Sequence, residues 1–163
     1  MPEKVEDLAA FLNEQGLCAS LTRKEVETIL EYTEEVYYDR NQVIMDIGEV
    51  GNALFIVIEG EAALFHENEQ GTETEVGRFH QGEFMGEMSF FDKKPRLVRM
   101  RAMRDCTRLL KLSRNMYERL RVEHPFITVN LLEFAIVSLD HLIRQMSTEV
   151  TVLTDYYFAP GKK

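Results

Sequence analysis

Short apolar segments separated by turn residues fill the stretch 35–112, and they constrain the fold more than any other feature of the sequence. No helical period interrupts residues 35–79, and glycines at positions 48, 51 and 60 fall between segments. Short strands with this spacing predict an antiparallel β-barrel of the double-stranded β-helix, or jelly-roll, type. The polar, acidic residues 66–74 predict an exposed hairpin loop. The expected strands are residues 36–38, 43–44, 53–58, 60–65, 75–79, 98–102 and 109–112.

Two short helices are expected before the barrel, in residues 1–34. Apolar positions over residues 3–15 follow a helical period, and Gly16 is suited to end that helix. Thr22 and Glu25 then have the spacing of a capping box, which starts the second helix. Both helices are interpreted as packing elements.

Two more helices are expected after the barrel, in residues 113–153. Ser113 is placed to cap the first, and Pro125 stands at a favourable early position in the second and longer one. Residues 154–163 are predicted to form a loose tail. The fold class predicted for the chain is therefore α+β, with a barrel between N-terminal helices and a long C-terminal helix.

The long helix carries a second signal, an apolar seam in which the spacing alternates between three and four residues. Such a seam is typical of a helix that packs along a twin helix. A separate apolar set on another face, Leu131, Phe134, Ala135 and Leu142, is available for the barrel. We therefore predict a homodimer, with a monomeric amphipathic helix as the alternative. The seam residues are Val129, Leu132, Ile136, Leu139, Ile143, Met146, Val150 and Leu153.

Charge and composition narrow the class of protein. A net charge of −9 argues against general nucleic-acid binding, which favours basic faces. The longest apolar run, residues 53–58, is too short to cross a membrane, and the acidic N-terminus lacks a signal segment. Cys18 and Cys106 have no partner motif, so we expect reduced thiols and a cytoplasmic location. The hypothesis is a protein without nucleic-acid or membrane partners.

Basic residues do gather near the last two strands. Because they alternate with apolar core positions, we interpret them as the solvated face of these strands, with a nucleic-acid patch as the less favoured alternative. The residues are Arg99, Arg101, Arg104, Arg108, Lys111 and Arg114.

An enzymatic function finds little support in the sequence. The four histidines, His66, His80, His124 and His141, form none of the paired spacings that a metal-dependent barrel enzyme needs. No nucleophile motif of the Gly-x-Ser-x-Gly type is present. The prediction is a non-enzyme without a metal or cofactor.

One stretch, residues 82–102, carries the groups that would recognise a phosphorylated sugar. A helical turn that starts after Gly86 offers free backbone N–H groups to an anion. Arg96 can supply a planar guanidinium to the same anion, and Glu87 can accept hydrogen bonds from sugar hydroxyls. An alternative interpretation is a hairpin turn with a helix-capping acid and a solvated arginine.

This stretch resembles the phosphate-binding cassette of the cyclic-nucleotide-binding domain family, through Gly86-Glu87-Met88-Ser89 and Pro95-Arg96. The glycine-spaced segments from Ile47 to Gly60 also resemble the family's barrel, so the resemblance extends over residues 21–135. It implies that Arg96 binds the cyclic phosphate, that Glu87 binds the ribose 2′-hydroxyl and that backbone N–H groups of the turn complete the site. The ligand-binding residues implied are Gly86, Glu87, Met88, Ser89, Arg96, Leu97 and Val98.

The cassette departs from the family where small or hydroxylic residues usually follow the arginine. Leu97 offers no hydroxyl to the phosphate, which lowers the expected affinity by one or two powers of ten and weighs mildly against cyclic GMP. Its bulk is also expected to narrow the pocket. In the last helix, His141, Leu142 and Gln145 are candidate contacts for the purine base, with core packing as the alternative for Leu142.

Two functional hypotheses remain open at this point. The first is a cytoplasmic sensor domain, free-standing and without a DNA-binding domain, that binds cAMP and moves its last helix against an unknown effector protein. The second is a degenerate or altered-ligand version of the same fold, which acts as a dimeric interaction module.

Overall fold

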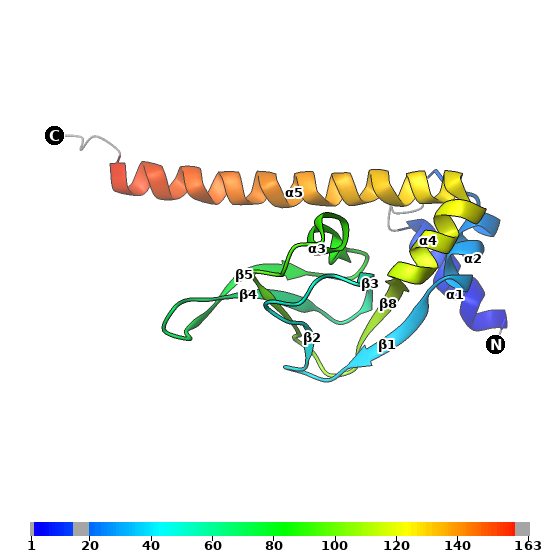
Figure 1. Ribbon diagram of the computed structural model, residues 1–163, viewed down its shortest axis with the longest axis horizontal. Helices are drawn as coiled ribbons and strands as arrows, with labels where there is room; N and C mark the ends of the chain where they lie inside the picture. The colour runs from blue at the N-terminus through cyan, green and yellow to red at the C-terminus, as the bar shows by residue number, and fades with distance from the viewer. Residues whose placement is uncertain (1, 15–19, 159–163) are drawn as a thin grey trace.

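A computed structural model describes the backbone of residues 2–14 and 20–158, together with the side chains of residues 7–14, 20–140 and 143–144. Two helices precede the strands, one short helix interrupts them and two helices follow, as Figure 1 shows. The helices are α1 (Pro2–Glu14), α2 (Arg23–Glu31), α3 (Glu87–Asp92), α4 (Arg114–Glu123) and α5 (Pro125–Phe158).

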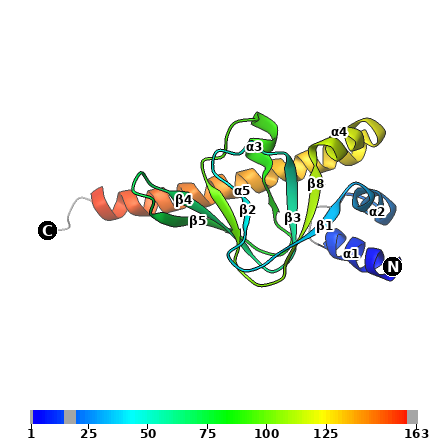
Figure 2. The ribbon, with the colours of Figure 1, turned by 60° about the horizontal axis from the view of Figure 1, so that its bottom comes forward.

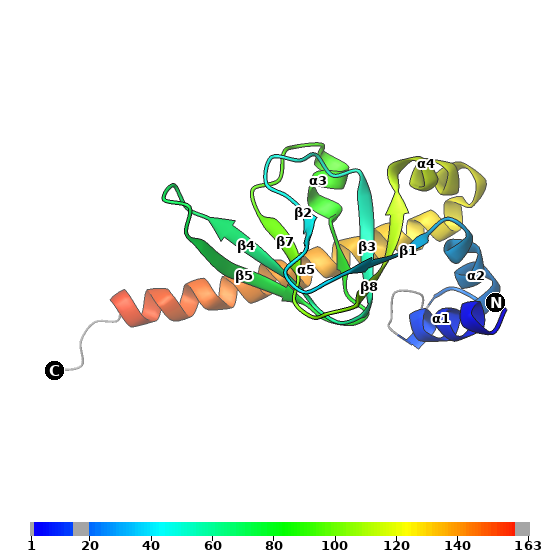
Figure 3. The ribbon, with the colours of Figure 1, turned by 90° about the horizontal axis from the view of Figure 1, so that it is seen from below.

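Eight strands form two four-stranded antiparallel sheets, which confirms the predicted α+β jelly roll. The first sheet has the order β1-β8-β3-β6 and the second the order β2-β7-β4-β5. The N-terminal helices and the β4–β5 hairpin lie at opposite ends of this barrel, and α5 runs along one side of it (Figures 2 and 3). The strands are β1 (Glu34–Tyr38), β2 (Val43–Met45), β3 (Ala53–Glu59), β4 (Ala62–Glu67), β5 (Glu73–Phe79), β6 (Phe84–Met85), β7 (Arg99–Ala102) and β8 (Thr107–Ser113).

Strand β3 is apolar at every position from Ala53 to Ile58 because both of its faces are buried. Phe55 and Val57 join the core between the two sheets. Leu54 and Ile56 belong to a second core, between the first sheet and the helices. The barrel is thus held by two apolar layers on the two faces of the first sheet, and strands β3, β6 and β8 contribute to both.

The N-terminal helices pack as predicted. The Thr22 side chain accepts a hydrogen bond from the Glu25 backbone N–H, and the Glu25 carboxylate accepts one from the Thr22 N–H, so the capping box is present. Leu12 of α1 and Val26 of α2 are fully buried in the helix-side core. The expected role of Gly16 falls outside the described residues.

The hairpin expected as a polar loop over residues 66–74 has a shorter turn than predicted, because its first two and last two residues belong to strands. His66 pairs with Thr74, and Glu67 pairs with Glu73 in the β4–β5 ladder. The true turn is residues 68–72, where the Asn68 side chain accepts hydrogen bonds from two backbone N–H groups. The polar composition misled the prediction because these strand ends are stabilised by arginines from a neighbouring strand.

Helix α5 extends farther than predicted, to Phe158, so residues 154–158 are helical and do not belong to a tail. Nothing in their composition breaks a helix before Pro160. Among the residues that the structure covers, no helix is long and apolar enough to cross a membrane.

The basic residues of β7 and β8 are paired with carboxylates on neighbouring strands and turns. Arg99 contacts Asp46, Glu67 and Glu73, and it is 21% exposed. Arg101 shares Glu73, and these contacts hold the pKa of the Glu73 carboxyl below its ordinary value. The pairing supports the interpretation that these cations belong to strand faces. The remaining pairs are Arg104–Glu61, Arg108–Glu35 and Lys111–Glu34.

Candidate functional site

The short helix α3 follows strand β6 after a single residue, Gly86. Gly86 has φ +93°, in the left-handed region that glycine adopts without strain. A Cβ atom at this position would also lie 3.1 Å from the Ala53 carbonyl oxygen of the adjacent strand. Glycine therefore allows the chain to turn from β6 directly into α3 and to present Glu87 inside the barrel.

Glu87 is almost completely enclosed, with 5% of its surface exposed. Burial raises the pKa of its carboxyl, while its own backbone N–H and the positive charge of Arg96 oppose that rise. A carboxylate held in this way keeps hydrogen-bonding capacity for a hydroxyl group.

Arg96, whose charge acts on Glu87, lies on the loop between α3 and β7. Its backbone is fixed by two hydrogen bonds of 2.9 Å, from its N–H to the Glu49 carbonyl and from the Gly48 N–H to its own carbonyl. Burial lowers the pKa of the guanidinium, and the charges of Glu49 and Glu87 counter the effect. Within the described part of the chain the guanidinium has no hydrogen bond or ion pair of its own. It is a half-buried cation available to an anion.

Gly51 forms the wall behind this cation. A Cβ atom on Gly51 would lie 2.8 Å from the Nη2 atom of Arg96 and 2.6 Å from the backbone nitrogen of Phe90. The Gly51 N–H donates to the Ser89 hydroxyl at 2.7 Å, and that hydroxyl donates to the Lys94 carbonyl at 2.6 Å. Only glycine fits here, because the helix and the arginine both approach its α-carbon closely.

The structure brings together four of the predicted site residues, Gly86, Glu87, Ser89 and Arg96. The Ser89 hydroxyl is used inside the protein, where it joins the Gly51 N–H to the Lys94 carbonyl. Leu97 is 81% exposed, so its side chain lies at the protein surface. Met88 is exposed as well, and Val98 is half-buried.

Helix α5 approaches the cassette at strand β6. The rings of Phe84 and Phe134 meet edge to face with their centres 5.9 Å apart, and the Ser138 hydroxyl donates to the Phe84 carbonyl at 3.4 Å. The candidate base contacts His141, Leu142 and Gln145 begin one turn farther along, but their side chains lie outside the described residues.

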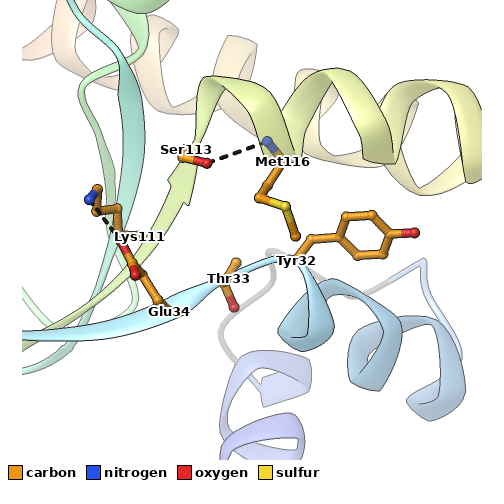
Figure 4. A pocket seen from close by; sticks show the side chains of 6 residues that line it. All are labelled: Tyr32, Thr33, Glu34, Lys111, Ser113 and Met116. Atoms are coloured by element: carbon orange, nitrogen blue, oxygen red, sulfur yellow. Dashed lines mark hydrogen bonds and ion pairs between the residues drawn. The ribbon is translucent and has the colours of Figure 1, made fainter.

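A separate small pocket of about 180 Å³ lies where α2 and β1 meet β8 and α4 (Figure 4). Its polar groups are engaged with each other, since Lys111 pairs with Glu34 at 2.8 Å and Ser113 accepts from the Met116 N–H at 3.3 Å. None of its lining residues belongs to the cassette, and we assign it no ligand. The lining residues are Tyr32, Thr33, Glu34, Lys111, Ser113 and Met116.

Two residues of this site, Gly51 and Glu49, were not predicted from the sequence. Gly51 was interpreted only as a turn glycine, and Glu49 was not identified as a negative charge near Arg96. Gly51 approaches the cassette closely although about 40 residues separate the two in the sequence. The spacing of Gly48, Glu49 and Gly51 was the local sequence pattern that could have pointed to this contact.

Known proteins similar to this chain were found both by sequence and by structure. The cyclic AMP-dependent protein kinase regulatory subunit of Blastocladiella emersonii is 32% identical over 111 residues, which cover 68% of this chain and 27% of that protein. The lysophospholipase nte1 of Aspergillus niger is 34% identical over 98 residues, which cover 60% of this chain and 6% of that protein. The chain thus spans only a small part of these curated relatives.

Among solved structures, the catabolite activator protein of Thermus thermophilus superposes with a TM-score of 0.70 at 30% identity. The superposition covers 85% of this chain and 63% of that one. The family profile described as "Cyclic nucleotide-binding domain" matches residues 35–124, more than half of the sequence and the whole of the cassette. This chain belongs to the cyclic nucleotide-binding domain family.

Proposed function

We propose that this domain is a regulatory sensor that binds cAMP and signals through its C-terminal helices. The observation that carries the proposal is the pairing of a half-buried Arg96 guanidinium, without an internal hydrogen-bonding partner among the described residues, with a buried Glu87 carboxyl. A cation for a phosphate and an acceptor for a hydroxyl, both fixed in one cassette, suit a cyclic nucleotide.

Each group has a defined role in this proposal. Arg96 binds the cyclic phosphate, and its burial makes the charge-assisted hydrogen bonds stronger than they are in water. Glu87 accepts the ribose 2′-hydroxyl. Gly86, Met88, Ser89 and Val98 contribute through their backbone, whose N–H groups face the anion.

The base is proposed to contact α5, through His141, Leu142 and Gln145. Phe134 and Ser138 already hold this helix against β6, which supports its closeness to the ligand. Leu97 lacks the hydroxyl that favours guanine, so cAMP is the first choice and cGMP the second. The name of the fungal kinase relative, a cAMP-dependent subunit, points in the same direction.

The exposed seam of α5 supports a homodimer. Val129 and Ile136 are 50% and 66% exposed, whereas Leu131 and Ala135, on the other face, are buried against the barrel. A helix whose inner face is covered and whose outer face is still apolar suits a twin helix. Leu132, Leu139, Ile143 and Met146 continue the proposed contact.

The effector that reads α5 is a protein of unknown identity, and we place the domain in the cytoplasm. The proposal includes no catalysis by this domain. Movement of α5 on binding requires that the ligand prefer one position of the helix, as in any population shift.

A second candidate function is a dimeric interaction module whose pocket is empty or takes another ligand. The exposed Leu97, at the position of a family hydroxyl, favours it. Such a module would work through its coiled-coil helix α5 alone.

Thermal unfolding distinguishes these candidates when it is measured with cAMP, with cGMP and with guanosine. Guanosine has no phosphate, so it represents another ligand that would not need the contact with Arg96. A ligand at 100 times its Kd stabilises the folded state by about 2.7 kcal/mol, which raises Tm by roughly 5–11 °C for a protein of this size. The sensor proposal predicts this shift with cAMP and a smaller one with cGMP. A shift with guanosine alone, or with none of the three, would favour the module.

A further inference from the structure

Arg114, the first residue of α4, makes contacts that the sequence did not suggest. It was predicted to lie on a basic, solvated strand face. Instead, its Nη2 atom donates to two backbone carbonyls, those of Gly51 and Phe90, both at 2.6 Å. Its guanidinium carbon lies 4.1 Å from the centre of the Phe90 ring.

The two carbonyls belong to two adjoining walls of the candidate anion site, α3 and the loop that contains Gly51. Phe90 is part of α3, and Gly51 belongs to the loop whose α-carbon packs against Nη2 of Arg96. A hydrogen bond from the Gly51 N–H to the Ser89 hydroxyl also links these walls. Arg114 therefore fixes the separation of α3 from the wall behind Arg96.

The same residue connects the site to the C-terminal helices. Arg114 begins α4, and Tyr117 in the next turn meets Phe90 and Phe91 edge to face, with ring centres 5.2 and 5.8 Å apart. A single residue, His124, separates the end of α4 from the start of α5. A shift of α3 relative to Gly51 must therefore either break a hydrogen bond of Arg114 or move Arg114, which is the first residue of α4.

We propose that Arg114 is a positioning residue, which holds the two walls of the anion site together and transmits their movement to α4. The identity of the ligand in this inference rests on the proposed function, whereas the contacts of Arg114 do not depend on it.

Arg114→Met tests this inference, because methionine keeps an unbranched chain over Phe90 and removes both hydrogen bonds. Arg121→Met is the matched control, since Arg121 lies in the same helix and only pairs with Glu118 at the surface. Arg114→Lys, which keeps the charge and a donor, is the conservative variant. Hydrogen exchange of α3 amides in the free protein and the Kd for cAMP are measured on each.

We expect α3 amides to exchange faster in Arg114→Met, and the cAMP affinity to fall about 10-fold to 100-fold. Adenosine, which has no phosphate, should bind this variant and the wild type alike. Arg114→Lys should recover part of the cAMP affinity. At saturating cAMP, α4 of the wild type should change its exchange rates and α4 of Arg114→Met should not.

Unchanged α3 exchange and unchanged cAMP affinity in a folded Arg114→Met variant would overturn the inference. So would an equal response of α4 to cAMP in both proteins. If wild-type protein binds no cAMP, the proposed function fails, and α3 exchange in the free protein still decides whether Arg114 holds the walls together.

Discussion

The Nη2 atom of Arg96 lies 2.8 Å from the position that a Cβ atom on Gly51 would take. This closeness shows that the Arg96 guanidinium packs directly on backbone, with no room for a side chain at position 51. The proposed anion site therefore depends on a residue outside the cassette, and this dependence can be tested directly.

Gly51→Ala should weaken both the fold and ligand binding. The added methyl group meets the backbone of Phe90 and Ser89 as well as Arg96, and backbone cannot move aside easily. We expect a loss of about 1–3 kcal/mol in the free energy of unfolding, and at least a tenfold loss of cAMP affinity as Arg96 is displaced.

Gly77→Ala is the matched control, because a Cβ atom there makes only an ordinary contact of 3.5 Å with the Leu64 side chain. Denaturant unfolding and calorimetry measure both effects. Equal stability and equal affinity in the two variants would contradict the tight seating of Arg96.

Glu87→Gln should stabilise the folded protein at neutral pH while it removes ligand binding. Burial raises the pKa of the Glu87 carboxyl, so the folded state binds this proton more readily than the unfolded state. The contribution of Glu87 to stability therefore falls as pH rises from the unfolded pKa through the folded pKa, and above that range the ionised carboxyl carries its full burial penalty.

A neutral glutamine removes this penalty, so the Tm of Glu87→Gln should exceed that of the wild type at pH 7 and not at pH 4. Glu69→Gln, at the exposed turn between β4 and β5, serves as the comparison. A lower Tm for Glu87→Gln at pH 7 would show that the ionised carboxyl stabilises the free protein.

Leu97→Thr should increase the affinity for cAMP. Leu97 is 81% exposed, so its replacement leaves the core unchanged, and threonine returns a hydroxyl to the place where the family usually has one. A hydrogen bond to a charged phosphate contributes about 1.5–3 kcal/mol, which corresponds to roughly one or two powers of ten in Kd.

Val76→Thr, at an exposed position on β5, controls for the general effect of the substitution. Calorimetry with cAMP and cGMP measures the change and its selectivity. If Leu97→Thr binds no better than the wild type, the missing hydroxyl does not limit affinity.

Ile136→Glu should dissociate the proposed dimer. The residue is 66% exposed on the apolar seam of α5, and a carboxylate there would be buried against the twin helix without a partner. Val137→Glu is a close control, because Val137 is also exposed at 64% but lies off the seam.

Sedimentation velocity should show a dimer for the wild type and for Val137→Glu, and a monomer for Ile136→Glu at the same concentration. A monomeric wild type, or a dimer in all three proteins, would contradict the seam as the interface.

The sequence predicted the barrel well because its signals are local. The apolar run from Ala53 to Ile58 and the glycines around it indicate a buried strand without knowledge of its neighbours. The ends of β4 and β5 were predicted wrongly as loop, since the charges of Glu67 and Glu73 are explained only by Arg99 on an adjacent strand.

The site was predictable to the extent that one stretch contains it. Glu87 and Arg96 are close in sequence and could be identified from spacing. Gly51 and Arg114 come from other segments, and their roles depend on backbone groups they approach across the fold. Such contacts leave no pattern in the sequence that contains them.

Calorimetric titration of cAMP into wild-type protein and into Arg96→Ala tests the central claim most directly, with Arg121→Ala as the control arginine. The account predicts saturable binding to the wild type and the control at micromolar Kd or better. For Arg96→Ala it predicts a loss of affinity of about 100-fold, as expected when a charge-assisted phosphate contact is removed. Equal binding by all three proteins, or no binding by folded wild type, would contradict it.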